Sequence, residues 1–239
     1  KKIMASLYLI PTPLGTTSLE KIFPPYNIEI INRLNHFVVE DVRTVRRFLK
    51  QISQERNINE VKFYLLNEHS SKEELVSLLE PLYNGFDLGL MSEAGCPAVS
   101  DPGADLVALA HKNNFTVIPL IGPSSVLLSL MASGFNGQNF EFVGYLPVQS
   151  EERIKALRRL EAKVYAENQT QIFIETPYRN MKMLETILKV CQPSTKLCIA
   201  ADITLESEFI KTKSIGEWRK NLPDLQNKPC IFLLYKTWG

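Results

Sequence analysis

The chain has 239 residues, of which 45% are hydrophobic, and its formal net charge at pH 7 is +1. This length fits one large domain or two small ones, and the apolar fraction is that of a globular protein with a core. A charge so near zero excludes a bulk field that draws the whole chain to nucleic acid or membrane, so any anion binding has to come from local patches.

Several features bear on localisation and metal binding. No uninterrupted apolar run reaches the roughly 18 residues that a membrane-spanning helix needs, so we expect no membrane association. Prolines interrupt the apolar stretch near the N-terminus, which we interpret as a first strand and not as a signal peptide. The four cysteines have neither metal-site nor disulfide spacing, which predicts reduced thiols in a cytoplasmic protein. The three histidines are scattered, and we expect no metal site.

The first half of the chain alternates between short apolar runs and amphipathic helical patterns. Strands are predicted at 6–11, 36–40, 61–66, 86–91 and 115–120. Helices are predicted at 41–53, 71–83, 103–113 and 124–133. Pro24 and Pro25 interrupt a further helix expected over 20–30. The alternation predicts βαβ units and a mainly parallel sheet.

The segment GFNGQN at 134–139 separates two parts of different pattern. It contains two glycines and two asparagines, and Gly134 is suited to end the preceding helix. We therefore predict an N-terminal α/β domain over 1–136 and a C-terminal domain over 137–239.

The second half predicts a mixed α/β layer. Strands are predicted at 140–144, 170–175, 196–203, 206–212 and 229–235, and helices at 150–166, 178–191 and 214–220. Because the third and fourth of these strands nearly abut, they are expected to form an antiparallel hairpin. The basic residues of the helix at 150–166 alternate with acidic ones, so we interpret them as solvated surface; they are Arg153, Lys155, Arg158, Arg159 and Lys163.

Open α/β sheets bind ligands at the carboxyl ends of their strands. Four loops begin there, at 11–16, 40–43, 92–103 and 121–125, and we expect them to face one cleft. The third loop, SEAGCPAVSDPG, packs two prolines, two glycines and two acids into a joint that needs only a few residues.

The end of this third loop is explained by helix capping, whereas its beginning is not. Asp101 is predicted as the N-cap of the next helix, with Pro102 at its first position, and Pro123 starts a helix in the same way. No packing role explains the seven residues 93–99, in which Gly95 permits close approach of a ligand to the backbone.

The sequence lacks the familiar nucleotide-binding motifs and the nucleophile elbow of hydrolases. The loop at 11–16 is not a dinucleotide-binding glycine motif, and neither a P-loop nor a nucleophile elbow occurs. The loops offer small residues, backbone groups and single acids, with few cations to neutralise phosphate. Such a site suits a ligand with ribose hydroxyls, an amino group and an adenine face.

Six segments occur in order along nearly the whole chain: LYLIPTPLGT, VVEDVRTVRRFL, LMSEAGCPAVSDPG, VIPLIGPSS, FVGYLP and FIETPYR. Together they resemble the tetrapyrrole (corrin/porphyrin) methylase family, nearest to its branch of small-subunit ribosomal RNA 2′-O-methyltransferases. Each segment alone is a weak signal, but six in order at matching intervals are highly specific.

The resemblance implies a two-domain fold with S-adenosylmethionine in the cleft between a mainly parallel N-terminal sheet and a mixed C-terminal sheet, and a homodimer. Pro13 and Gly15 would line the cleft near the transferred methyl, with Pro13 counted among the cofactor contacts and Gly15 among the substrate contacts. The other cofactor contacts it implies are Glu93, Gly95, Cys96, Pro97, Ala98, Val99, Ser124, Ser125, Glu175, Ala200 and Pro229.

The chain departs from the branch outside its cofactor loops. An arginine and a lysine of the branch are replaced by Ala201 and Leu205, a histidine by Thr44, and an Arg-Gly-Glu segment by 228–230. Methyl transfer is therefore better supported than ribosomal RNA as the acceptor. A tetrapyrrole or corrin methyltransferase and a non-catalytic S-adenosylmethionine-binding regulatory protein are the alternatives.

The helix predicted at 41–53 carries further candidate site residues. Arg43, Arg46, Arg47 and Lys50 share one face, which fits a bound anion such as RNA phosphate but equally an ordinary solvated surface. Four residues lie at the expected cleft and are candidate catalytic groups: Glu40, Asp41, Arg43 and Glu93. Asp41 also fits a helix N-cap, and the sequence does not single out a base.

Overall fold

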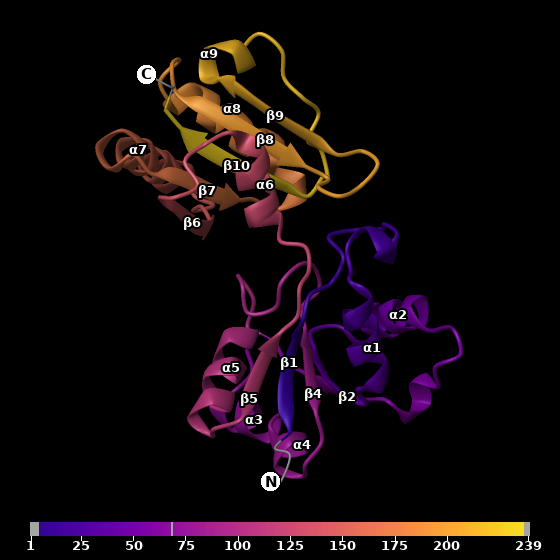
Figure 1. Cartoon of the computed structure of the whole chain (residues 1–239). Helices are drawn as coiled ribbons and strands as arrows, with labels where there is room; N and C mark the ends of the chain where they lie inside the picture. Colours follow the sequence, from indigo (N-terminus) through magenta and orange to yellow (C-terminus); the bar gives the residue numbers. More distant parts are fainter. Residues whose placement is uncertain (1–4, 68, 237–239) are drawn as a thin grey trace. The chain divides into compact units, whose positions relative to one another are not determined.

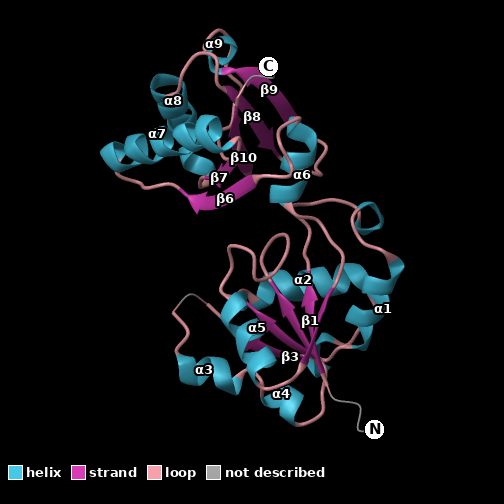
Figure 2. Ribbon diagram, turned by 60° about the vertical axis from the view of Figure 1, so that its left-hand side comes forward, coloured by secondary structure: helices cyan, strands magenta, loops and turns pink. Residues whose placement is uncertain are grey.

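A computed structural model describes residues 5–67 and 69–236, and the chain divides into two compact units, Lys1–Ser124 and Ser125–Gly239. This division precedes the boundary expected at 136/137. The difference arises because helix α6 (Ser125–Ser133), which is strongly apolar, packs against strands β9 and β10 of the second unit. Figures 1 and 2 show each unit as a sheet with helices on both faces.

The first unit contains a five-stranded sheet in which every pair of neighbours is parallel, as predicted. In the order β3-β2-β4-β1-β5, its strands are β3 (Lys62–Leu65), β2 (His36–Val39), β4 (Leu88–Met91), β1 (Ser6–Ile10) and β5 (Thr116–Pro119). The chain leaves β1 and β2 toward the β3 edge and leaves β4 toward the β5 edge. The carboxyl end of β4, between β1 and β2, is therefore a topological switch point, where such sheets bind ligands.

Helices cover both faces of this sheet. One face packs against α1 (Pro25–Arg33) and α2 (Val42–Ile52), and the other against α3 (Lys72–Ser77), α4 (Glu80–Tyr83) and α5 (Gly103–Lys112). The unit also has single 3-10 turns at Leu19–Lys21 and Ile58–Glu60. The basic face predicted for α2 is exposed, whereas Val45 and Leu49 on the opposite face are buried in the core.

Prolines explain two differences in helix boundaries and one difference in helix capping from the sequence prediction. The helix expected at 71–83 divides into α3 and α4, since Pro81 has no N–H to continue the hydrogen-bond ladder. Pro25 does not merely interrupt a helix but begins α1 at its first position, where the missing N–H is harmless. Helix α5 begins at Gly103, so Pro102 and not Asp101 occupies the N-cap position. The Asp101 side chain still caps this end, because its Oδ1 accepts from Gly103 N at 2.7 Å.

The second unit contains the predicted mixed sheet. In the order β6-β7-β10-β8-β9, its strands are β6 (Phe140–Tyr145), β7 (Thr170–Ile174), β10 (Cys230–Tyr235), β8 (Lys196–Ala201) and β9 (Phe209–Ser214). Only β6 and β7 pair in parallel, and β8 and β9 form the expected antiparallel hairpin. Besides α6, its helices are α7 (Ser150–Glu167), α8 (Asn180–Val190) and α9 (Ile215–Trp218), with a 3-10 turn at Pro177–Arg179.

Helix α7 is not uniformly solvated, which corrects the sequence interpretation. Arg153 is only 3% exposed, and its Nη1 donates to Val148 O at 2.8 Å. Its Nε is buried with no hydrogen-bond partner among the described residues. Glu161 is also buried, but its carboxylate accepts from Gln192 N and Thr195 Oγ1. The buried carboxylate of Glu161 is therefore hydrogen-bonded, whereas the buried guanidinium of Arg153 is only partly so.

All four cysteines are free thiols, and three of them are buried. Within residues 5–67 and 69–236, no helix combines the length and the apolarity that crossing a membrane requires.

Candidate functional site

The loops at the carboxyl edge of the first sheet bind one another through backbone groups. Thr12 and Gly95 exchange two hydrogen bonds, from Thr12 N to Gly95 O at 2.9 Å and from Gly95 N to Thr12 O at 3.1 Å. The Thr12 hydroxyl also donates to Ser92 O at 3.2 Å. The loop after β1 is therefore joined to the loop after β4, which we call the β4 loop (residues 92–102).

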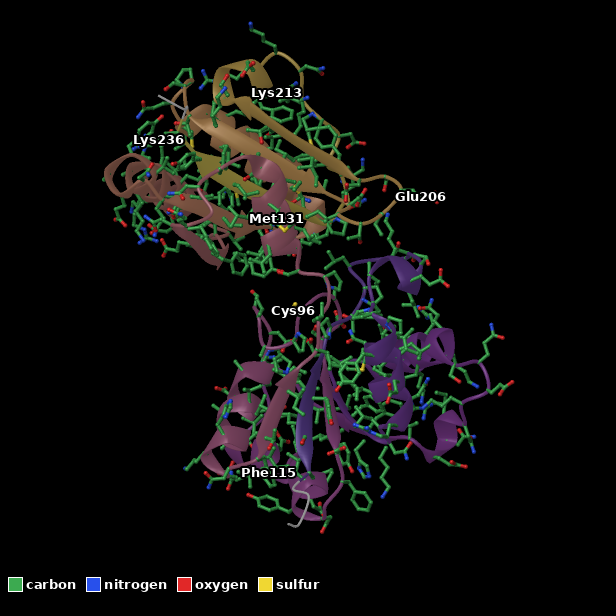
Figure 3. The ribbon with its side chains drawn as sticks, in the orientation of Figure 1. Cys96, Phe115, Met131, Glu206, Lys213 and Lys236 are labelled. Carbon is green, nitrogen blue, oxygen red and sulfur yellow. The ribbon has the colours of Figure 1, made fainter. Side chains whose placement is uncertain are left out.

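The exits of β5 and β2 join the same group. Cys96, labelled in Figure 3, directs its Sγ to Pro123 O at 3.5 Å. A side chain at Gly122 would overlap the ring of Pro11, so glycine is required for this close approach of the β5 exit to the end of β1. Glu93 N donates to Glu40 Oε1 at 3.4 Å. These contacts bring the four strand exits together at one edge of the sheet.

The β4 loop holds an unusual backbone conformation. Gly95, Ala98 and Ser100 have φ angles of 79°, 64° and 58°. A non-glycine residue in the left-handed region costs about 1–2 kcal/mol, and such residues cluster at functional sites. Asp101 offsets this strain, since its Oδ1 accepts from Ala98 N at 3.1 Å as well as from Gly103 N. The segment is thus held in one conformation by its neighbours.

Two adjacent acids at the β2 exit differ in their protonation. Burial, followed by the hydrogen bond and negative charge of Asp101, raises the pKa of Glu40 to about 7, although the Glu93 N–H acts in the opposite direction. Asp41 is the N-cap of α2, and its Oδ1 accepts from Thr44 N at 2.6 Å. That hydrogen bond lowers the pKa of Asp41. Near neutral pH Glu40 can therefore accept or release a proton, whereas Asp41 stays ionised.

The remaining first-unit candidates lie on these loops or beside them. The segment containing Pro13 and Gly15 adjoins Gly95, because Leu14 Cδ2 lies 3.3 Å from the position of a Cβ on Gly95. Pro97 is buried and Val99 is exposed on the same loop, and the two serines at the start of α6 are half-buried. Ser124 ends the first unit and Ser125 begins the second.

The three candidates of the second unit gather around the start of β10. Ile231 pairs with Ala200 on one side and with Ile174, the residue before Glu175, on the other. Pro229, two residues before Ile231, accepts a hydrogen bond from Asp202 N at 3.0 Å. The Glu175 carboxylate is 2% exposed and binds Arg179 Nε at 2.9 Å and Nη2 at 2.7 Å.

The basic face of α2 is partly engaged within the protein. Arg43, Arg46 and Arg47 are exposed, and no described carboxylate forms an ion pair with them. Arg46 lies over the ring of Phe63, with its guanidinium carbon 5.5 Å from the ring centroid. Lys50 instead donates to two backbone oxygens beyond the helix, Gln54 O and Arg56 O, each at 2.8 Å.

Sequence reasoning misses Thr12 and the second role of Asp101. Thr12 is 4% exposed although it lies in a loop between two prolines, and this buried hydroxyl joins two strand exits. No local pattern reveals that partner. The sequence predicts Asp101 only as a cap, whereas it also influences Glu40, which is distant in sequence. In the described part of the chain, no group of three or more His, Cys, Asp or Glu side chains is arranged to hold a metal ion.

Several known proteins are similar to this chain in sequence. The chain is 31% identical to ribosomal RNA small subunit methyltransferase I of Vibrio cholerae over 211 residues, which cover 88% of this chain and 69% of that protein. The protein of the same name from Escherichia coli O157:H7 is 31% identical over 88% of this chain and 70% of its own length. That of Streptococcus pyogenes serotype M3 is 31% identical over 98% and 77%.

A solved structure has the same fold. The crystal structure of the methyltransferase CobJ aligns with a TM-score of 0.65 over 98% of this chain and 95% of that one, at 15% sequence identity. No protein-family model matches the chain. The relatives nevertheless identify it: the chain belongs to the tetrapyrrole methylase family of methyltransferases, in the branch of the ribosomal RNA small subunit methyltransferase I proteins.

Proposed function

We propose that this chain methylates the 2′-hydroxyl of a ribose in small-subunit ribosomal RNA, with S-adenosylmethionine as the methyl donor. The observation that carries the proposal is the position of Glu40, whose pKa is raised to about 7, beside a strained loop at the switch point of a parallel sheet. The names of the curated relatives support the choice of acceptor.

The chemistry of the strand exits fits S-adenosylmethionine better than a polyphosphate. The β4 loop presents backbone groups and small side chains at Gly95, Cys96 and Ala98, together with the acids Glu93 and Asp101. Acids near the ligand favour a cofactor with a sulfonium and an ammonium group and disfavour phosphates. We assign the cofactor to this loop and to Pro13, Ser124 and Ser125. When bound, S-adenosylmethionine supplies an electrophilic methyl group whose bonding pair departs with a neutral thioether.

Glu40 is the general base that we assign to the reaction. A ribose hydroxyl becomes a better nucleophile when its proton passes to a positioned carboxylate as the new O–CH₃ bond forms. The proton then resides on Glu40, and its pKa near 7 allows its release to water afterwards. Asp41 is less suited, because its carboxylate is engaged as a helix cap and its pKa is lowered.

The acceptor is held, in this proposal, by the exposed arginines of α2. Arg43 lies in the first turn of the helix, next to Glu40 and Asp41, and orients the ribose phosphate. Arg46 and Arg47 continue the same face and neutralise further phosphates. Gly15 leaves room for the acceptor on the loop after β1. The basic face of α2, called the basic stripe below, thus gives a nearly neutral protein a local site for an anionic polymer.

The second-unit residues Glu175, Ala200 and Pro229 contact the adenosine part of the cofactor in this proposal. The proposal also includes that the protein acts as a homodimer in the cytoplasm. Ala201, which replaces an arginine of the branch, is fully buried in β8 and offers no charge to RNA. This departure favours a second candidate, a methyltransferase that acts on a tetrapyrrole. An inactive cofactor-binding protein would bind S-adenosylmethionine but transfer no methyl group.

The deciding experiment incubates the purified chain with small ribosomal subunits that lack ribose methylation and with labelled S-adenosylmethionine. Nuclease digestion and mass spectrometry then locate the label. One labelled 2′-O-methylnucleotide is expected. Labelling of a tetrapyrrole but not of RNA would favour the second candidate, and cofactor binding without any transfer would contradict catalysis.

A further inference from the structure

A pocket of about 280 Å³ lies at the opposite end of the first sheet from the proposed site of methyl transfer. Its walls come from the residues just before β2 and β4 and from the end of α1, so it opens at the amino ends of the strands. The side chains that matter here are Arg33, Asn35, His36, Phe86 and Asp87. The volume is near the lower end of the range for small-molecule sites, which suits one small ligand or one unit of a polymer.

The pocket presents an aromatic ring that is supported from behind. Phe86 is 54% exposed, and it stacks on the buried His36 with ring centroids 5.0 Å apart and 22° between the planes. His36 is fixed in turn, since its Nδ1 lies 2.9 Å from Tyr64 Oη. Burial and the charge of Lys62 lower the pKa of His36, so the supporting ring is neutral at pH 7. Phe86 therefore offers a rigid, uncharged face to a second planar ring.

Fixed polar groups surround this ring. Arg33 is held by Tyr8, because its Nη2 donates to Tyr8 Oη at 3.1 Å. Asp87 is held by the backbone of β1, since its Oδ1 accepts from Ser6 N at 2.8 Å. The pocket thus combines a stacking surface with a cation and an acceptor, and this combination recognises a nucleobase and its phosphate.

A series of hydrogen bonds connects the residues that line the pocket with the end of α2. The stripe ends at Lys50, whose Nζ binds Arg56 O. The Arg56 guanidinium in turn donates to Leu34 O and lies 3.5 Å from Asn35 Oδ1, both on lining residues of the pocket. Helix α2 has 11 residues and therefore spans about 16 Å. The helix and these bonds thus link the carboxyl edge of the sheet with its amino edge.

We propose that this pocket binds one unpaired nucleotide of the RNA substrate, with the base stacked on Phe86 and its phosphate bound by Arg33. The inference rests on the proposed function, because it takes RNA to be the acceptor. The pocket is a second anchor for the RNA, remote from the reacting ribose. A free mononucleotide has the same chemistry and is the other source that an experiment has to separate.

The test measures binding of a fluorescein-labelled, unstructured 12-nucleotide RNA to the full chain by anisotropy. Phe86→Ala is expected to weaken binding by about 5- to 100-fold, the loss typical of one stacked base, and Phe86→Trp is expected to restore it. The matched control is Tyr83→Ala. Tyr83 is 58% exposed, and its ring centroid also lies 5.0 Å from one neighbouring aromatic ring, that of Phe115. Melting temperatures of all variants verify that they are folded.

Equal effects of Phe86→Ala and Tyr83→Ala would overturn the inference. So would an effect of Phe86→Ala on binding of AMP or GMP alone, measured by saturation-transfer NMR, with RNA binding unchanged. Methyl transfer to small ribosomal subunits is measured separately on the wild type. A wild type that methylates ribosomal RNA, with RNA affinity insensitive to Phe86, contradicts only the pocket. A wild type that binds RNA through Phe86 but transfers no methyl group contradicts only the proposed function.

Discussion

The two edges of the first sheet are built from different parts of the chain. At the carboxyl edge, the strand exits bind one another mainly through backbone atoms, as in the two hydrogen bonds between Thr12 and Gly95. At the amino edge, the pocket is formed by side chains, chiefly Phe86 stacked on His36. A site made of backbone fixes its geometry through the fold, whereas one made of side chains changes with single substitutions. The reaction that we propose lies at the first edge, and the nucleotide pocket that we propose lies at the second.

The largest effect is expected at Glu40, the side chain to which we assign the proton transfer at the carboxyl edge. Glu40→Gln should lower methyl transfer by about 10²- to 10⁴-fold, because proton abstraction is lost, and should leave cofactor affinity unchanged. The wild-type rate should rise as pH increases through about 7, the pKa of Glu40. Initial rates across pH 5–9, alongside calorimetric titration with S-adenosylmethionine, check both statements.

The neighbouring acid supplies the control for Glu40. Asp41→Asn preserves an N-cap, since asparagine caps as well as aspartate, so stability and rate should change little. If Asp41→Asn abolishes transfer and Glu40→Gln does not, the assigned base is wrong.

The second effect concerns the conformation of the carboxyl edge. Gly95→Ala should weaken binding of S-adenosylmethionine at least about tenfold, because alanine disfavours φ of 79° by about 1–2 kcal/mol and Gly95 pairs with Thr12. Calorimetry on the folded variant measures this. Gly134→Ala is the matched control, because Gly134 has φ of 76° and open space around it. It should lose similar stability but bind normally. Equal binding by both variants would reduce the β4 loop to a structural joint.

The third prediction concerns the exposed arginines of α2, which lie between the two edges, and tests whether they bind RNA phosphates. Replacing Arg46 and Arg47 together with alanine should flatten the dependence of RNA binding on salt, by about 0.7 in the log–log slope for each phosphate that is no longer neutralised. Cofactor affinity should not change, and stability should change by less than about 0.5 kcal/mol. Filter binding over a salt series gives the slopes. The exposed pair Arg158 and Arg159 on α7 provides a control of equal charge. Identical slopes for both double variants would return the stripe to ordinary solvated surface.

The smallest effect is on stability. Folding raises the pKa of Glu40 from its ordinary value of 4.5 to about 7, so the folded state retains a proton that the unfolded state releases between these values. Stability from this group is therefore complete below pH 4.5 and is lost as pH rises through 7. Glu40→Gln should remove this decline and melt about 2 °C higher than wild type at pH 8, with no difference at pH 4.5. Thermal melts at both pH values decide, and a larger gap at the lower pH would contradict the assignment.

Local sequence patterns predict the sheets well and the helix ends less well. Strand positions follow from short apolar runs such as that of β4, because burial on both faces requires such runs. The predicted unit boundary lies too late because α6 precedes the turn at 134–139 yet contacts β9 and β10 of the second sheet, with Leu130 buried. These two strands begin at Phe209 and Cys230, far along the chain, and the periodicity of α6 carries no information about them.

The site is predictable as a set of loops but not as a set of interactions. The position of four loops at strand ends follows from parallel topology alone. The perturbed pKa of Glu40 does not, because it requires Asp101 beside it and a degree of burial that only the assembled sheet creates. The bond from Thr12 to Ser92 likewise joins two loops that sequence treats as separate.

Arg153 has a consequence for engineering. It buries a cation whose Nε finds no acceptor among the described residues, in the first turns of α7, where the helix dipole is itself unfavourable to positive charge. A buried donor without an acceptor costs about 1–3 kcal/mol, so Arg153 lowers the free energy of unfolding relative to an apolar side chain at the same position. Arg153→Met keeps the apolar stem and removes the charge. It is the substitution with which to begin a thermostable version of the protein, and differential scanning calorimetry should record a higher melting temperature.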